Sequence, residues 1–101
     1  MRASWTKRAE LQLLDTIDHI AHDDPVAAFQ WGERLVKRAD AAAGMKLSGR
    51  VVPELGRDDV REVFLGAYRI ISRVMATSIE VITVIEGHMQ LGSDLVDPDA
   101  A

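Results

Sequence analysis

Arginine side chains recur through the second half of the chain at spacings that could build an anion site. Arg69 and Arg73 are four residues apart in a run of alternating apolar residues, so both would project from one face of a strand. Arg61 belongs to the preceding run of this type, and Arg50 lies in the connector before it. Such guanidinium groups could hold a phosphate or a partner's carboxylates. A polar face whose arginines pair with the protein's own acidic residues is the alternative interpretation.

A carboxylate and an imidazole could add acid–base chemistry to these arginines. Glu54 precedes the apolar runs and could reach Arg69 or Arg61, and His88 follows the last run. Glu54 and His88 could therefore serve as an acid–base pair. Trp31, in the first half of the chain, could belong to the core or to a groove that a partner covers.

Metal and cofactor chemistry find little support in the sequence. His19 and His22 are three residues apart, and two ligands are too few for a zinc site. The chain has no cysteine, no phosphate-binding glycine loop and no Gly-x-Ser-x-Gly elbow. We therefore expect neither a metal nor a cofactor, and the absence of cysteine fits a cytoplasmic protein.

Charge is distributed unevenly along the 101 residues. Residues 44–75 carry six basic and four acidic side chains, whereas residues 76–101 carry five acidic side chains and no Lys or Arg. The net charge is −4, which argues against a protein whose affinity comes mainly from contacts with nucleic-acid phosphates. We therefore expect no direct sequence-specific DNA binding. No apolar run approaches the length of a membrane span. We expect one domain over residues 1–91 and an acidic, flexible tail over residues 92–101.

Two helices and a small sheet must position these side chains. Apolar residues at helical spacing predict helices over residues 6–22 and 25–43, the second begun by Asp24-Pro25, and the short link between them predicts an antiparallel hairpin. The period then changes to two, which predicts strands over 60–65, 68–75 and 79–85. Ser4-Trp5 could form an edge strand. The predicted fold is α+β, with the N-terminal helical hairpin packed on a small antiparallel sheet of three to four strands.

Five short motifs occur in order along the chain. They are Asp24-Pro25-x-Ala27-Ala28, Gly49-Arg50-x-Val52-Pro53-Glu54-Leu55, Val60-Arg61-Glu62, Tyr68-Arg69-Ile70-Ile71 and Val84-Ile85-x-Gly87. From about residue 5 to residue 91, their order and spacing resemble the RelE/ParE superfamily, the toxins of bacterial type II toxin–antitoxin modules. The long helical hairpin and the Gly-Arg-x-Val-Pro-Glu connector resemble the ParE branch more closely.

The resemblance implies a growth inhibitor that a cognate antitoxin neutralises. ParE-type toxins act on DNA gyrase without established catalytic residues, and this is the function we expect. The alternative is a ribosome-dependent messenger RNA endoribonuclease of the RelE or YoeB type. In that case Glu54, Arg69 and His88 would match the base, phosphate clamp and acid of the YoeB group. A non-toxic relative that acts as a binding module is the third interpretation.

The resemblance also assigns a binding role to the arginines. Arg50, Arg61, Arg69 and Arg73, together with Trp31, are expected to contact the antitoxin or the target. Many ParE relatives end the last strand with His-Gly-Arg-Arg, where this chain reads Glu86-Gly87-His88-Met89. This loss of basic groups favours gyrase over ribosomal RNA as the target.

Overall fold

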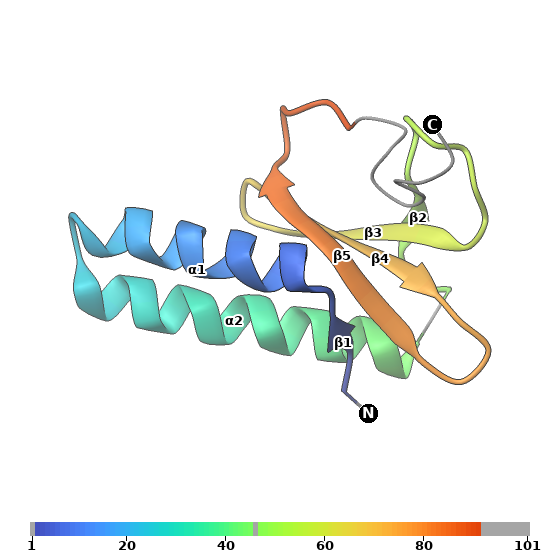
Figure 1. Cartoon of the computed structure of the whole chain (residues 1–101), viewed down its shortest axis with the longest axis horizontal. Helices are drawn as coiled ribbons and strands as arrows, with labels where there is room; N and C mark the ends of the chain where they lie inside the picture. The colour runs from blue at the N-terminus through green and yellow to red at the C-terminus, as the bar shows by residue number, and fades with distance from the viewer. Residues whose placement is uncertain (1, 46, 92–101) are drawn as a thin grey trace.

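Two antiparallel helices lie along one face of a five-stranded sheet in the computed structural model, which describes residues 2–45 and 47–91 (Figure 1). The strands are β1 (Ser4–Trp5), β2 (Arg50–Val51), β3 (Val60–Leu65), β4 (Tyr68–Val74) and β5 (Ile79–Glu86). Their order in the sheet is β1-β5-β4-β3-β2. The acidic tail predicted for residues 92–101 lies outside the described residues.

The two helices begin where the sequence places their capping residues. Helix α1 (Lys7–Ala21) starts after Thr6, whose hydroxyl accepts a hydrogen bond from the Ala9 amide at 3.0 Å. Helix α2 (Pro25–Gly44) starts after Asp24, whose carboxylate accepts one from Ala27 at 3.1 Å. The two predicted helices are confirmed to within one residue at each end. Neither helix is long and apolar enough to cross a membrane.

The sheet has more strands than predicted, and it is mixed rather than antiparallel. Strands β3, β4 and β5 form the predicted antiparallel meander. However, β1 runs parallel to β5, with Ser4 beside Glu80, and β2 adds a fifth strand at the opposite edge. The edge strand suggested at Ser4-Trp5 is present as β1, whereas β2 was not predicted. Both contain two residues, too few to show a period of two in the sequence, so their pairing with β5 and β3 defines them as strands.

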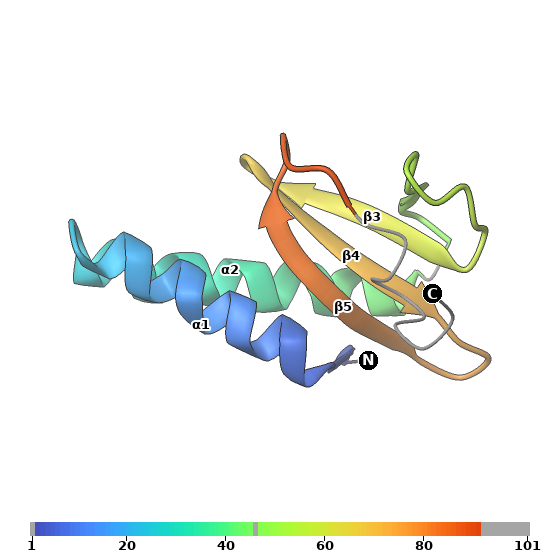
Figure 2. The same ribbon diagram turned by 45° about the horizontal axis from the view of Figure 1, so that its top comes forward.

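Apolar side chains fill both sides of the sheet. On the helix side, Leu35 and Ala39 of α2 pack with Ile70 and Val84 of the sheet. On the far side, a second cluster contains Val52, Val60, Ile71 and Ile82, with Leu55, Ile85 and Leu91 packed against it. The connector between β2 and β3 therefore covers part of the far face (Figure 2). Alternation along β4 places Ile70 towards the helices, and places Arg69 and Ile71 on the far face.

Candidate functional site

Arg69 is a buried arginine held by two carboxylates on the far face of the sheet. Its guanidinium makes a paired contact with Glu54, with Nη1 donating to Oε2 at 2.8 Å and Nη2 donating to Oε1 at 2.9 Å. Nη2 also donates to Glu62 Oε1 at 2.9 Å. Only 5% of the Arg69 side chain is exposed, and the Glu62 side chain is fully buried at 0%. The paired contact matches the fork of a guanidinium to the two oxygens of a carboxylate.

Arg50 joins the same set of charges from β2. Arg50 pairs with Glu62 across the β2–β3 ladder, and its Nε lies 3.4 Å from Glu62 Oε2. We call Arg50, Glu54, Glu62 and Arg69 the Arg69 network. Two guanidinium groups face two carboxylates in this network, so its formal charges cancel. Glu62 is a member that the sequence prediction missed, because only the strand register reveals that it faces the two arginines.

Electrostatics fix the protonation states within the Arg69 network. The hydrogen bonds from Arg69, with its positive charge, lower the pKa of Glu54 from 4.5 to about 2. The same hydrogen bonds from Glu54, followed by those of Glu62, raise the pKa of Arg69. Glu54 is therefore ionised at neutral pH and has little affinity for a proton. Arg69 has its Nη groups occupied by the protein's own carboxylates.

Arg69 also holds the segment that follows β5. Its Nη1 donates to the Met89 carbonyl oxygen at 3.2 Å. A pocket of about 370 Å³ lies beside the network, and its lining includes Phe64, Gly87 and Gln90 as well as Arg50, Glu54 and Arg69. The connector carrying Glu54 and the segment carrying Met89 are thus both tied to one side chain of β4.

His88 lies outside this pocket. Its side chain is 77% exposed, and its Nδ1 lies 3.5 Å from Glu86 Oε2. The structure thus brings Glu54 and Arg69 together, as the sequence suggested, but does not place His88 with them. The proposed acid–base pair of Glu54 and His88 is not assembled in this structure.

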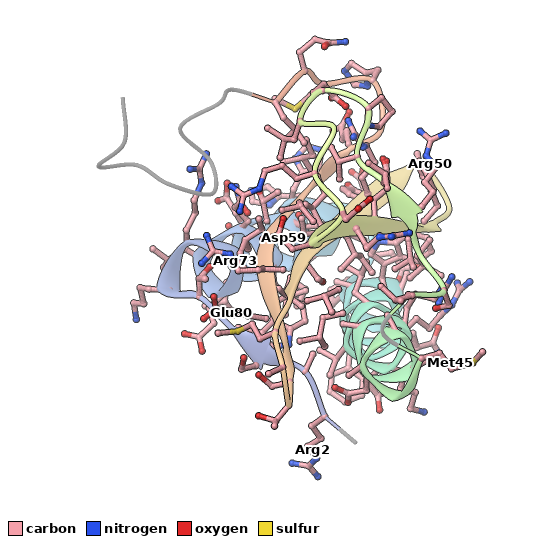
Figure 3. All side chains as sticks on the ribbon, turned by 90° about the vertical axis from the view of Figure 1, so that its right-hand side faces the viewer. Arg2, Met45, Arg50, Asp59, Arg73 and Glu80 are labelled. Carbon is pink, nitrogen blue, oxygen red and sulfur yellow. The ribbon has the colours of Figure 1, made fainter. Side chains whose placement is uncertain are left out.

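The four predicted arginines do not share one site. Arg61 is two residues before Val63 on β3, so its side chain leaves the sheet on the helix side, opposite to Arg69. It donates to the Gly49 carbonyl oxygen at 3.1 Å. Arg73 lies near Asp59 and Glu80, whereas Arg50 points to solvent on the other side of the view (Figure 3). Only Arg50 and Arg69 meet, through Glu62.

Trp31 sits at the same end of the sheet as Arg69 but on the helix side, between α2 and the β3–β4 turn. Its ring meets Tyr68 edge to face, with centroids 6.0 Å apart and planes at 60°. The guanidinium carbon of Arg34 lies 4.8 Å from the Trp31 ring centroid. This is the distance of a cation–π contact, and it leaves Arg34 exposed on α2.

Three further residues, Arg34, Phe64 and Arg38, were missed by the sequence prediction. Phe64 is exposed on β3, and the guanidinium carbon of Arg50 lies 5.3 Å from its ring centroid. Arg38 of α2 donates from Nε to the Phe64 carbonyl oxygen at 3.4 Å. The spacing of Trp31, Arg34 and Arg38 was the available signal, because positions three and four apart on a helix share a face.

Several large apolar side chains are exposed on the helical hairpin. Leu11 and Leu14 of α1 and Val26 and Phe29 of α2 all have more than half of their surface exposed, with Phe29 at 68%. A shallow groove of about 520 Å³ follows α1 past Leu11, Leu14 and Ile17. Leu11, Leu14 and Ile17 line this groove together, and contiguous exposed apolar residues are typical of a surface that a partner covers.

Comparisons with known proteins agree with the fold. Residues 3–91 match the family model of the ParE toxin of the type II toxin–antitoxin system parDE. A solved structure described as the chromosomal ParDE TA system from P. aeruginosa is similar, with a TM-score of 0.68 and 22% sequence identity. That similarity covers 85% of this chain and 95% of the other, and at this identity it supports the fold alone. No curated protein sequence matches the chain.

Proposed function

The chain belongs to the ParE toxin family of type II toxin–antitoxin systems, and on this premise we propose that it inhibits bacterial growth by acting on DNA gyrase until its antitoxin binds it. Its place of action would be the cytoplasm, where gyrase and DNA are found. In this proposal the protein acts by binding, and the antitoxin acts by covering the surface that binds.

The closed Arg69 network is the observation that carries this proposal. A general base works best when its pKa lies near the working pH, whereas the pKa of Glu54 is about 2. Arg69 would have to release Glu54 or Glu62 before its Nη groups could hold a phosphate. His88 stands apart at the surface. These three features favour recognition over cleavage of RNA.

The outer surface of the helical hairpin supports the antitoxin part of the proposal. An amphipathic helix of a partner could bury Leu11, Leu14 and Phe29, which are exposed in the isolated chain. Burial of apolar area is the main source of affinity at such a surface. A partner that folds on binding also fits the long, shallow shape of the groove along α1.

The decisive experiment is induction of the chain in a bacterial host, with gyrase-dependent DNA breaks and messenger RNA decay followed in parallel. We expect growth arrest with DNA breaks, and we expect His88→Ala, at an exposed position outside the Arg69 network, to remain toxic at equal protein levels. Arrest with rapid messenger RNA cleavage that disappears in His88→Ala would establish the nuclease instead. Normal growth at verified expression would identify a non-toxic binding module.

A neutralisation assay tests the hairpin surface separately. Phe29→Glu should leave toxicity unchanged and weaken rescue by the co-expressed antitoxin, because a charge would then lie in the apolar interface. Gln30→Glu, an exposed neighbour on the same helix, is the matched control and should be rescued like the original chain. Equal rescue of both variants would exclude the hairpin surface as the antitoxin site.

A further inference from the structure

The outer side of α1 carries four exposed side chains that are spaced symmetrically about their midpoint. Spacings of four, three and four residues separate these side chains, which are Lys7, Leu11, Leu14 and Asp18. Such spacings place residues on one face of a helix. Leu11 is 54% exposed and Leu14 is 61% exposed, between a basic and an acidic end. We call these four residues the α1 stripe.

Among the described residues, neither the sheet nor α2 covers the α1 stripe. Ala9 and Leu13 lie on the opposite side of α1 and pack towards the sheet. Ile17 faces α2, because a Cβ on Gly32 would lie 2.7 Å from its Cδ1. The turn end of the helical hairpin also projects beyond the sheet (Figure 1). The stripe is therefore open to another molecule.

The two ends of the α1 stripe carry opposite charges that are available to a partner. Lys7 and Asp18 are 11 residues apart, which is about 16 Å along a helix, so they cannot pair with each other. Within residues 2–45 and 47–91, no oppositely charged side chain lies within ion-pair distance of either one. Another molecule with the reverse order of charges would satisfy both ends.

A second copy of the chain presents this reverse order when its α1 runs antiparallel to the first. A twofold axis midway between Leu11 and Leu14 places each Leu11 against the partner's Leu14. The same register places Lys7 opposite the partner's Asp18, once on each side of the axis. A parallel arrangement would instead bring like charges together at both ends. The charges therefore select the antiparallel direction.

We propose that the isolated chain forms an antiparallel homodimer through the α1 stripe. Burial of the central leucines supplies the attraction, and the two ion pairs fix the direction and register. A contact through about 16 Å of one helix is smaller than the roughly 1,200–2,000 Å² of a standard interface. The dimer should therefore form with a dissociation constant in the micromolar range or above.

The homodimer goes beyond the proposed function, because it involves only the chain's own residues. Leu11 and Leu14 also belong to the surface proposed for the antitoxin, and one partner at a time can cover them. Dimer and antitoxin complex would therefore exclude each other on α1, and only the free chain would dimerise.

Sedimentation analysis of the purified chain over a wide concentration series, without antitoxin, tests this inference. We expect the apparent mass to rise from one chain to two, and the association to weaken as salt is added. Lys7→Glu and Asp18→Lys should each raise the dissociation constant at least about tenfold, because each replaces two attractive contacts by repulsive ones. Both place a charge that the helix dipole favours, so both variants should fold.

An equimolar mixture of the two variants gives the decisive measurement. In a mixed dimer, the substituted position of one variant faces the substituted position of the other, and the two original charges face each other. Both contacts are then attractive, so the mixture should dimerise like the original chain although each variant alone does not. Lys37→Glu, an exposed position on α2, is the matched control and should dimerise normally.

Other results would overturn the homodimer or move it to another surface. A chain that stays monomeric over the whole series would exclude it. Equal self-association of all variants, or a mixture no tighter than its components, would show that the α1 stripe is not the contact. Circular dichroism establishes that the variants keep the helical content of the original chain before they are compared.

The same variants separate this inference from the proposed function. If the original chain is monomeric and Lys7→Glu only weakens rescue by the antitoxin, the stripe belongs to the antitoxin and the homodimer is wrong. If the original chain causes no growth arrest yet dimerises, and the mixture restores dimerisation, the proposed function fails while the homodimer stands.

Discussion

At the scale of single residues, Arg69 is a charged side chain in a position that an apolar residue could fill. It lies on the far face of the sheet, between its strand partners Phe64 and Ile85, and its desolvation is offset by Glu54 and Glu62. A buried ion pair of this kind adds little stability beyond what an apolar residue would give, but removing one partner leaves an uncompensated charge. The pairing holds the connector and the Met89 segment in fixed places, as the proposed recognition role requires.

Glu62→Gln should reveal the dependence of the fold on this pairing. The substitution keeps the shape of a fully buried side chain but removes the charge that faces Arg69. We expect the free energy of unfolding to fall by about 3 kcal/mol, measured by urea denaturation. The control is Asp59→Asn in the partly exposed Arg57–Asp59 pair, where a loss below about 1 kcal/mol is expected. A smaller loss for Glu62→Gln than for the control would contradict the role of the network.

The lowered pKa of Glu54 predicts how the stability of the fold changes at acidic pH. Its pKa is lowered from 4.5 to about 2, so its ionised form stabilises the fold fully above pH 4.5. That contribution is lost as the pH falls through about 2. The stability difference between the original chain and Glu54→Gln should therefore stay constant down to pH 4.5 and shrink below it. An NMR titration of the Glu54 carboxyl carbon with a midpoint near 4.5 would show that the pairing with Arg69 is weak in solution.

At the scale of elements, the sequence predicted the helix starts and the β3–β4 turn, because residues close together in the chain determine them. Thr6 and Asp24-Pro25 start the helices wherever the rest of the chain lies, and Gly66 permits the tight β3–β4 turn. Strand β1 could only be suggested, and its parallel direction not at all, because both come from pairing with a distant β5. The candidate site was also predicted only in part. The contact of Glu54 with Arg69 was anticipated, whereas the contacts of Glu62 with Arg50 and Arg69 depend on the strand register.

Three glycines differ in the two features that would strain a substituted residue, a positive φ and a close neighbouring side chain. Gly66 has φ of 57°, fits the first position of a two-residue hairpin turn, and faces Trp31 closely. Gly56 has φ of 60° but an open surrounding, and Gly44 at the end of α2 has an open surrounding and no positive φ.

Substitution of each glycine by alanine should therefore give a graded loss of stability. We expect Gly44→Ala to be neutral or slightly stabilising, Gly56→Ala to cost about 1 kcal/mol, and Gly66→Ala to cost about 2 to 3 kcal/mol. Thermal unfolding gives the order, and Trp fluorescence should change only in Gly66→Ala. Equal losses for Gly56→Ala and Gly66→Ala would mean that Trp31 moves away at no cost.

At the scale of the whole molecule, one sheet separates two apolar clusters that are covered by different kinds of structure. The helix side is covered by regular elements, whereas the far side is covered by the connector and by Leu91. A chain of 101 residues has a modest core, so neither side is expected to be stable without the other. The Arg69 network lies on the far side. Its geometry therefore depends on the packing of the helices across the sheet.

Ile70 and Ile71 provide a matched test of this dependence. They are neighbours on β4, almost fully buried at 1% and 0%, and they face opposite clusters. Replacing either by alanine should cost about 2 to 5 kcal/mol, because both substitutions leave a cavity. If the sheet couples the two sides, Ile71→Ala will lower the urea midpoint of the helical circular dichroism as Ile70→Ala does, because unfolding is then one transition. A far side that unfolds independently would leave the helical transition of Ile71→Ala unchanged, and the Arg69 network would then be able to open while the helical hairpin stays folded.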